Sequence, residues 1–134
     1  MWPGTLIFLS ILFPNMIKNH QKIHPKFKLN GVCFNELAFT FKNKNSLIKN
    51  KSLVSFLSDW LNNNDQINLK TSGTTGNPKK IKVDKKAMIL SAQNTGKYFN
   101  IMSGDNALLC LPIKYIAGKM MIVRAIVLGL DLHV

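Results

Sequence analysis

Apolar residues recur at helical spacing in the middle of the chain. Between positions 52 and 61 they fall three and four residues apart, which predicts an amphipathic helix. They are Leu53, Phe56, Leu57, Trp60 and Leu61. The polar run 62–65, Asn-Asn-Asn-Asp, follows directly. Because Asn and Asp side chains compete for backbone hydrogen bonds, we expect the helix to end there.

Two short extended segments follow and frame a loop. Residues 67–70 and 80–83 are predicted strands, the second with Ile81 and Val83 on one face. Asp84 is suited to cap a helix that we expect over 85–99. The stripe predicted to face the core of this helix is Met88, Ala92, Thr95 and Phe99. Nearer the N-terminus, a turn at Asn30-Gly31 leads into an expected strand at 32–34.

The last third of the chain continues the alternation of strand and helix. A turn at Gly104-Asp105 precedes the apolar run 107–111, which predicts a strand buried on both faces. Residues 116–128 predict an apolar helix that ends at Gly129. A further strand is expected over 130–134. The order β-loop-β-α-β-α-β predicts an α/β fold of layered sheet and helix.

The chain ends inside this last predicted strand. A sheet broken there would present an unpaired edge, which folded domains normally cover. We therefore expect residues 16–134 to be the N-terminal part of a larger domain, truncated at its C-terminus.

The first fifteen residues call for a separate interpretation. The apolar run 6–13 (LIFLSILF) is bracketed by prolines and is shorter than the roughly 20 residues that span a bilayer. No Lys or Arg precedes it, and Phe13-Pro14-Asn15 is a poor signal cleavage site. We expect a cytoplasmic protein without stable membrane insertion. Because Met16 offers a second start, our hypothesis is that residues 1–15 are an upstream extension that is not native.

The chain is strongly basic, with 18 Lys+Arg against 6 Asp+Glu and a net charge of +12. Such a charge attracts anionic partners. Arg124 is the one arginine, however, whereas proteins that recognise nucleic acids more often use several arginines to contact bases. Aromatic residues that could stack on bases are also not interleaved with the basic residues. We expect no nucleic-acid partner. Cys33 and Cys110 are far apart and lack zinc-ligand spacing, so no metal site is predicted.

The loop between the two predicted strands has the composition of a phosphate-binding segment. Glycines let backbone N–H groups approach phosphate oxygens, hydroxyls add donors, and a lysine adds positive charge. The residues expected to hold phosphate are Thr71, Ser72, Gly73, Thr74, Thr75, Gly76 and Lys79. The segment is neither a Walker A nor a dinucleotide-binding pattern. Composition alone leaves open a Ser/Thr/Gly-rich hairpin connection without a ligand.

The segment TSGTTGNPK at 71–79 resembles the signature loop of the adenylate-forming (AMP-binding) superfamily, which includes acyl-CoA synthetases, luciferases and adenylation domains. Lys80 departs from the glycine found in many members. The segment LPIKYIAG at 111–118 is similar to the superfamily's Pro-x-x-aromatic-x-x-Gly element, which implies an acyl-pocket or gating role for Tyr115. The stretches KIHPKFKLNG and YIAGKMMIVRAIVLGLDL resemble bacterial o-succinylbenzoate:CoA ligases of menaquinone synthesis.

This resemblance implies an ATP-dependent acid:CoA ligase that uses ATP, Mg²⁺, coenzyme A and a small-molecule carboxylate. The superfamily's catalytic and Mg²⁺-binding residues would lie beyond position 134. We therefore expect no catalytic residue within this fragment and no turnover by the fragment alone. Lys119 and Arg124 could bind a carboxylate or a CoA phosphate, but five residues apart they do not share a helix face. The alternative function is a non-catalytic basic protein that binds nucleotides or nucleic acid.

Overall fold

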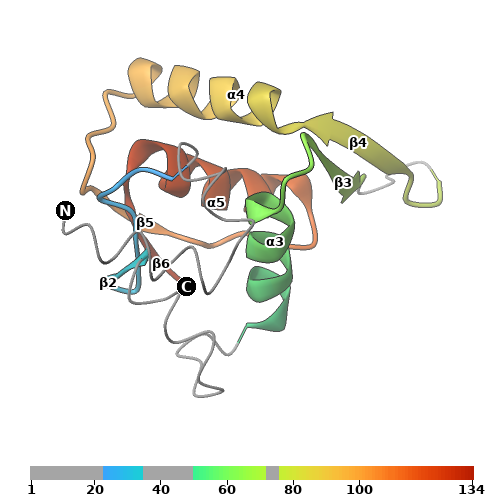
Figure 1. Cartoon of the computed structure of the whole chain (residues 1–134), viewed down its shortest axis with the longest axis horizontal. Coiled ribbons are helices and arrows are strands. Elements are labelled where there is room, and N and C mark those ends of the chain that lie inside the picture. The colour runs from blue at the N-terminus through green and yellow to red at the C-terminus, as the bar shows by residue number, and fades with distance from the viewer. Residues whose placement is uncertain (1–22, 35–49, 72–75) are drawn as a thin grey trace.

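The computed structural model describes residues 23–34, 50–71 and 76–134 (Figure 1). The expectations for residues 1–22 lie outside this part. The architecture is mixed α/β, as predicted. Its elements are β1 (Lys28–Leu29), β2 (Val32–Cys33), α3 (Lys51–Leu61), β3 (Gln66–Lys70), β4 (Lys80–Asp84), α4 (Lys85–Tyr98), β5 (Asn106–Leu108), α5 (Ile116–Leu128) and β6 (Asp131–His133). No described helix has the length and apolar character needed to cross a membrane.

Four of the strands form one sheet in the order β2-β1-β6-β5. β1 and β2 are antiparallel and are joined by Asn30 and Gly31, whose φ angles of 51° and 79° are left-handed. Two successive left-handed residues match the right-handed twist of a two-residue hairpin. β6 runs parallel to both of its neighbours, and its Leu132 pairs with Leu29 of β1 and Ala107 of β5.

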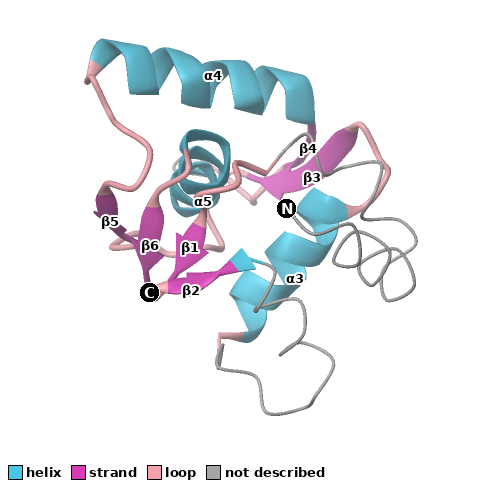
Figure 2. Cartoon of the chain, turned by 60° about the vertical axis from the view of Figure 1, so that its left-hand side comes forward, coloured by secondary structure: helices cyan, strands magenta, loops and turns pink. Residues whose placement is uncertain are grey.

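Helix α5 lies between this sheet and α4, so that the molecule has the layers sheet, α5 and α4 (Figure 2). A helix covered on two sides must be apolar around most of its surface, which explains the nearly continuous apolar sequence of α5. Ile122, Val123 and Ile126 are fully buried. The two helices pack tightly at Gly96 of α4, where an added Cβ would lie 2.6 Å from a methyl group of Leu128.

Helix α3 begins and ends at asparagines. The side chain of Asn50 accepts hydrogen bonds from the backbone N–H groups of Ser52 and Leu53, at 3.1 and 3.2 Å, which satisfies two of the unpaired donors of the first turn. The helix buries its apolar stripe and ends at Asn62, as the polar run predicted. The buried members are Leu53, Phe56, Leu57 and Trp60.

Two sequence predictions about burial are wrong. β5 covers only 106–108 and pairs with β6 alone, so it is an edge strand and not one buried on both faces; Leu108 is 65% exposed. Phe99 is 67% exposed, because the buried stripe of α4 continues through Gly96. The last strand, β6, lies inside the sheet, between β1 and β5.

Candidate functional site

The predicted phosphate loop connects the two strands of a separate hairpin. β3 and β4 pair antiparallel from Gln66↔Asp84 to Lys70↔Lys80. The next pair, Thr71 and Lys79, closes the loop through the backbone: Thr71 N–H donates to the Lys79 carbonyl at 3.0 Å. The Lys79 N–H donates to the Thr71 hydroxyl oxygen at 3.1 Å. The first and last residues of the predicted motif are therefore bonded to each other.

The structure places only part of the loop. Ser72, Gly73, Thr74 and Thr75 lie outside the described residues. Gly76 and Lys79 are exposed, and the Lys79 ammonium makes no ion pair within the described ranges 23–34, 50–71 and 76–134. A Cβ added to Gly76 would meet nothing within 4 Å, and its φ is not left-handed. Neither crowding nor strain within the described chain therefore requires glycine at this position.

Positive charge is concentrated on the exposed face of the hairpin near this loop. Lys70 and Lys80 are directly paired across the two strands at the loop end, whereas Lys82 lies further along β4, opposite Asn68. Like charges placed opposite each other on a sheet destabilise it by a few tenths of a kcal/mol up to about 1 kcal/mol. An anion bound near this end of the hairpin would relieve that repulsion.

Tyr115 is the N-cap residue of α5, and its side chain makes no capping hydrogen bond. Its backbone N–H donates to the Pro112 carbonyl at 3.2 Å. The side chain is 38% exposed, and the Lys114 ammonium lies 4.8 Å from the centre of its ring. No hydrogen bond or ring contact in the described part of the chain joins Tyr115 to the 71–79 loop.

Lys119 and Arg124 point to different neighbours, in agreement with their five-residue spacing. The Lys119 ammonium lies 5.9 Å from the centre of the Phe56 ring on α3. The Arg124 Nε donates to the Thr95 hydroxyl on α4 at 3.4 Å. Arg124 is thus held between two helices, whereas Lys119 borders a cavity. Their functional roles remain predictions.

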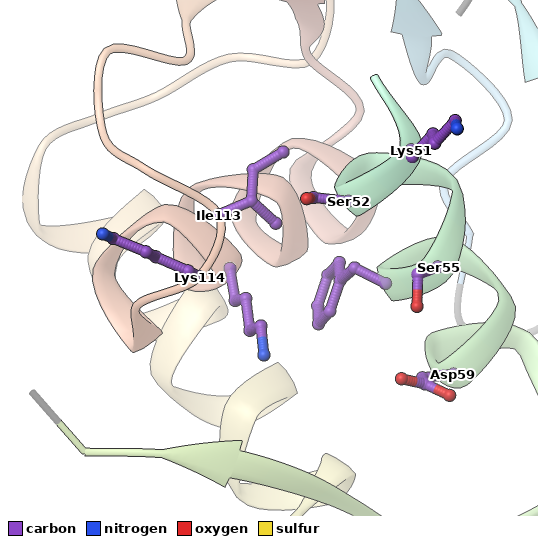
Figure 3. A pocket seen from close by; sticks show the side chains of 8 residues that line it. Lys51, Ser52, Ser55, Asp59, Ile113 and Lys114 are labelled. Carbon is purple, nitrogen blue, oxygen red and sulfur yellow. The ribbon is translucent and has the colours of Figure 1, made fainter. Parts of the chain in front are cut away.

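A cavity of about 320 Å³ lies between α3 and the connection from β5 to α5 (Figure 3). Of the residues that line it, only Lys119 was considered from the sequence for a binding role. A usable signal was present, because Ser52, Ser55 and Asp59 follow one another at spacings of three and four and so form a polar stripe on α3. The lining residues are Lys51, Ser52, Ser55, Phe56, Asp59, Ile113, Lys114 and Lys119.

Comparisons with known proteins give one informative likeness. No family model matches the chain, and no curated protein matches it. The chain is similar to the crystal structure of an acyl-CoA synthetase (AMP-forming)/AMP-acid ligase II-like protein from Dyadobacter fermentans, with 35% sequence identity, a TM-score of 0.60 and coverage of 69% of this chain. The chain spans 27% of the length of that protein. This likeness supports the resemblance to the adenylate-forming superfamily, and the observed α/β arrangement matches part of that protein.

Proposed function

We propose that this chain supplies the ATP-phosphate-binding part of an AMP-forming acyl-CoA ligase, with o-succinylbenzoate as the carboxylate substrate. The observation that carries the proposal is the loop at 71–79, held closed by Thr71 and Lys79 at the end of a lysine-rich hairpin. The likeness to an AMP-forming acyl-CoA synthetase supports the reaction class. The substrate rests on the sequence resemblance of residues 22–31 and 115–132.

The proposed reaction has two steps. A carboxylate oxygen attacks the α-phosphorus of ATP, an O–P bond forms, and the bond from that phosphorus to the bridging oxygen breaks, so that pyrophosphate leaves with the electron pair. The CoA thiol then attacks the acyl carbon, AMP leaves, and the thiol proton passes to solvent. Negative charge therefore grows on the departing pyrophosphate during the first step.

In this reaction the loop would stabilise charge rather than transfer protons. Lys79 is exposed at the mouth of the loop and would place an ammonium beside the β- and γ-phosphates. The Thr71–Lys79 hydrogen bonds would hold that mouth in place before ATP arrives. Mg²⁺ would supply further neutralisation of the phosphate charge; among the described residues no group of three His, Cys, Asp or Glu is suited to hold it.

The test is pyrophosphate release by the complete ligase with ATP, CoA and o-succinylbenzoate. We expect Lys79→Ala to lower kcat/KM by about 10²-fold or more, the usual effect of removing one preorganised charge-stabilising donor. The matched control is Lys82→Ala, an exposed lysine on the same hairpin, which should retain activity. Equal losses in both variants would refute the role of the loop. Turnover of other carboxylates but not o-succinylbenzoate would refute the substrate alone.

A further inference from the structure

The cavity between α3 and the β5–α5 connection has an unbalanced charge. Three lysines line it, Lys51, Lys114 and Lys119, against the single carboxylate of Asp59. Within residues 23–34, 50–71 and 76–134, the ion pair present is His133–Asp131, so none of these three ammonium groups is paired with a carboxylate. The cavity therefore borders positive charge that the described protein does not neutralise.

Helix α3 adds to this charge. Lys51 and Ser52 belong to its first turn, which contains no acidic residue. The N-terminal end of a helix carries partial positive charge and favours anions. The hydroxyls of Ser52 and Ser55 stand on the cavity side of the helix and offer hydrogen-bond donors (Figure 3). Charge, helix end and hydroxyl donors all favour a negatively charged ligand.

The remaining wall of the cavity is apolar. Phe56 and Ile113 line it from opposite sides and are only 3% and 6% exposed, so both are firmly held by the core. The Lys119 ammonium already lies 5.9 Å from the centre of the Phe56 ring. A ligand with an apolar body would contact the small part of these two side chains that faces the cavity, which an inorganic ion would not do.

The acidic residue indicates how such a ligand would be oriented. Asp59 lies at the far end of the α3 stripe from Ser52, and Ile113 lies across from Ser52 (Figure 3). Repulsion from Asp59 would direct the charged groups of the ligand toward the Ser52 end. The Lys51 and Lys114 side chains stand on opposite rims and point outward (Figure 3). Their flexible four-carbon stems allow them to turn toward a bound anion.

We propose that this cavity, which we name the α3–α5 pocket, binds an organic anion with an apolar body and at least two negative charges, either an aromatic dicarboxylate or a phosphate monoester. The pocket shares no residue with the 71–79 loop. Its assignment can therefore be tested independently of phosphate binding by that loop, whereas the choice of an aromatic dicarboxylate rests on the proposed function.

The experiment is isothermal titration of the 134-residue chain with three probes: o-succinylbenzoate, phenyl phosphate and inorganic phosphate. We expect at least one organic probe to bind more tightly than inorganic phosphate. The double variant Lys51→Gln/Lys119→Gln should weaken that binding by about tenfold or more, the effect of losing charged hydrogen bonds. Binding of one organic probe alone would support the pocket and assign its ligand class.

Two controls separate this pocket from general electrostatics and from the loop. The double variant Lys86→Gln/Lys97→Gln removes the same charge from exposed positions on α4 and should leave the affinity within about twofold, as expected for surface charges remote from a site. Lys79→Ala should also leave it unchanged. Binding that falls equally in both double variants, or that is lost in Lys79→Ala, would overturn the proposal. The proposal would also be overturned if neither o-succinylbenzoate nor phenyl phosphate bound. Circular dichroism melting checks that each variant is folded.

Discussion

Gly118 packs directly against the backbone of Pro112. A Cβ added to Gly118 would lie 2.7 Å from the Pro112 carbonyl carbon and 2.8 Å from the Leu111 carbonyl oxygen, closer than real Cβ atoms approach. Tyr115 stands between these two residues, and its N–H donates to the same Pro112 carbonyl. The spacing Pro-x-x-aromatic-x-x-Gly is thus the geometry of a connection folded back onto the first turn of α5, with the aromatic ring at the bend.

This contact predicts that Gly118→Ala destabilises the protein. Alanine favours a helix interior by about 1 kcal/mol over glycine, but the overlapping atoms belong to the backbone and cannot move aside cheaply. We expect a net loss of about 1–3 kcal/mol in the free energy of unfolding, typical of overpacking, measured by urea denaturation. The comparison is Gly96→Ala, where the close neighbour is the flexible Leu128 side chain, and the loss should be smaller. A larger loss at Gly96 would contradict this explanation.

A buried lysine gives a second stability prediction. Lys85 is fully buried at the start of α4, and its ammonium donates to the Asn62 carbonyl at 3.0 Å and to the Asn62 side-chain oxygen at 2.9 Å. Replacement by Met keeps the apolar stem but leaves those oxygens without this donor, at a cost of about 1–3 kcal/mol. Urea denaturation should show such a loss for Lys85→Met. The neighbouring exposed Lys86→Met should change the stability by less than about 0.5 kcal/mol.

The Thr71 hydroxyl makes one of the two hydrogen bonds that close the phosphate loop; the other is between backbone atoms. In Thr71→Val the Lys79 N–H loses its side-chain acceptor, whereas Thr71→Ser keeps one. We expect faster hydrogen exchange of the Lys79 amide in the valine variant, together with weaker ATP binding. The serine variant should resemble the unmodified chain in both measurements. Unchanged Lys79 exchange in Thr71→Val would show that the side-chain bond does not close the loop.

A substitution at Gly76 is expected to affect ATP binding but not the stability of the fold. Because a Cβ there has open space in the described structure, Gly76→Ala should leave the free energy of unfolding within about 0.5 kcal/mol of the original. If phosphate approaches the backbone closely at this point, the same substitution weakens ATP binding. Equal ATP affinities for the two proteins would remove Gly76 from the proposed phosphate site.

The elements predicted best from the sequence are those whose ends and apolar faces are set by neighbouring residues in the chain. α5 and its end at Gly129 were predicted at their observed bounds, because the apolar pattern and the left-handed glycine are local features. The Asn62 end of α3 and the Asp84 cap of α4 follow from side-chain bonds to nearby backbone. The α/β class followed from the order of the elements.

Features that depend on tertiary neighbours were missed. Residues 107–111 are as apolar as a central strand. Whether β5 lies at the centre or the edge of the sheet depends on the order of the strands, which a local sequence pattern does not contain. Lys85 was not expected in the core, since its partners are the oxygens of Asn62, 23 residues earlier. The α3–α5 pocket joins segments some 60 residues apart, so only its α3 stripe could be found from sequence.

The proposed function depends on binding of the ATP phosphates by the 71–79 loop. The most direct measurement is the dissociation constant for Mg·ATP, by isothermal titration of the unmodified chain, Lys79→Ala and the matched hairpin variant Lys82→Ala. We predict that Lys79→Ala weakens binding by about tenfold or more, as expected when a charged contact to phosphate is lost, and that Lys82→Ala changes it by less than about twofold. Equal weakening by both variants, or no binding of Mg·ATP to the unmodified chain, would show that the loop does not bind the ATP phosphates.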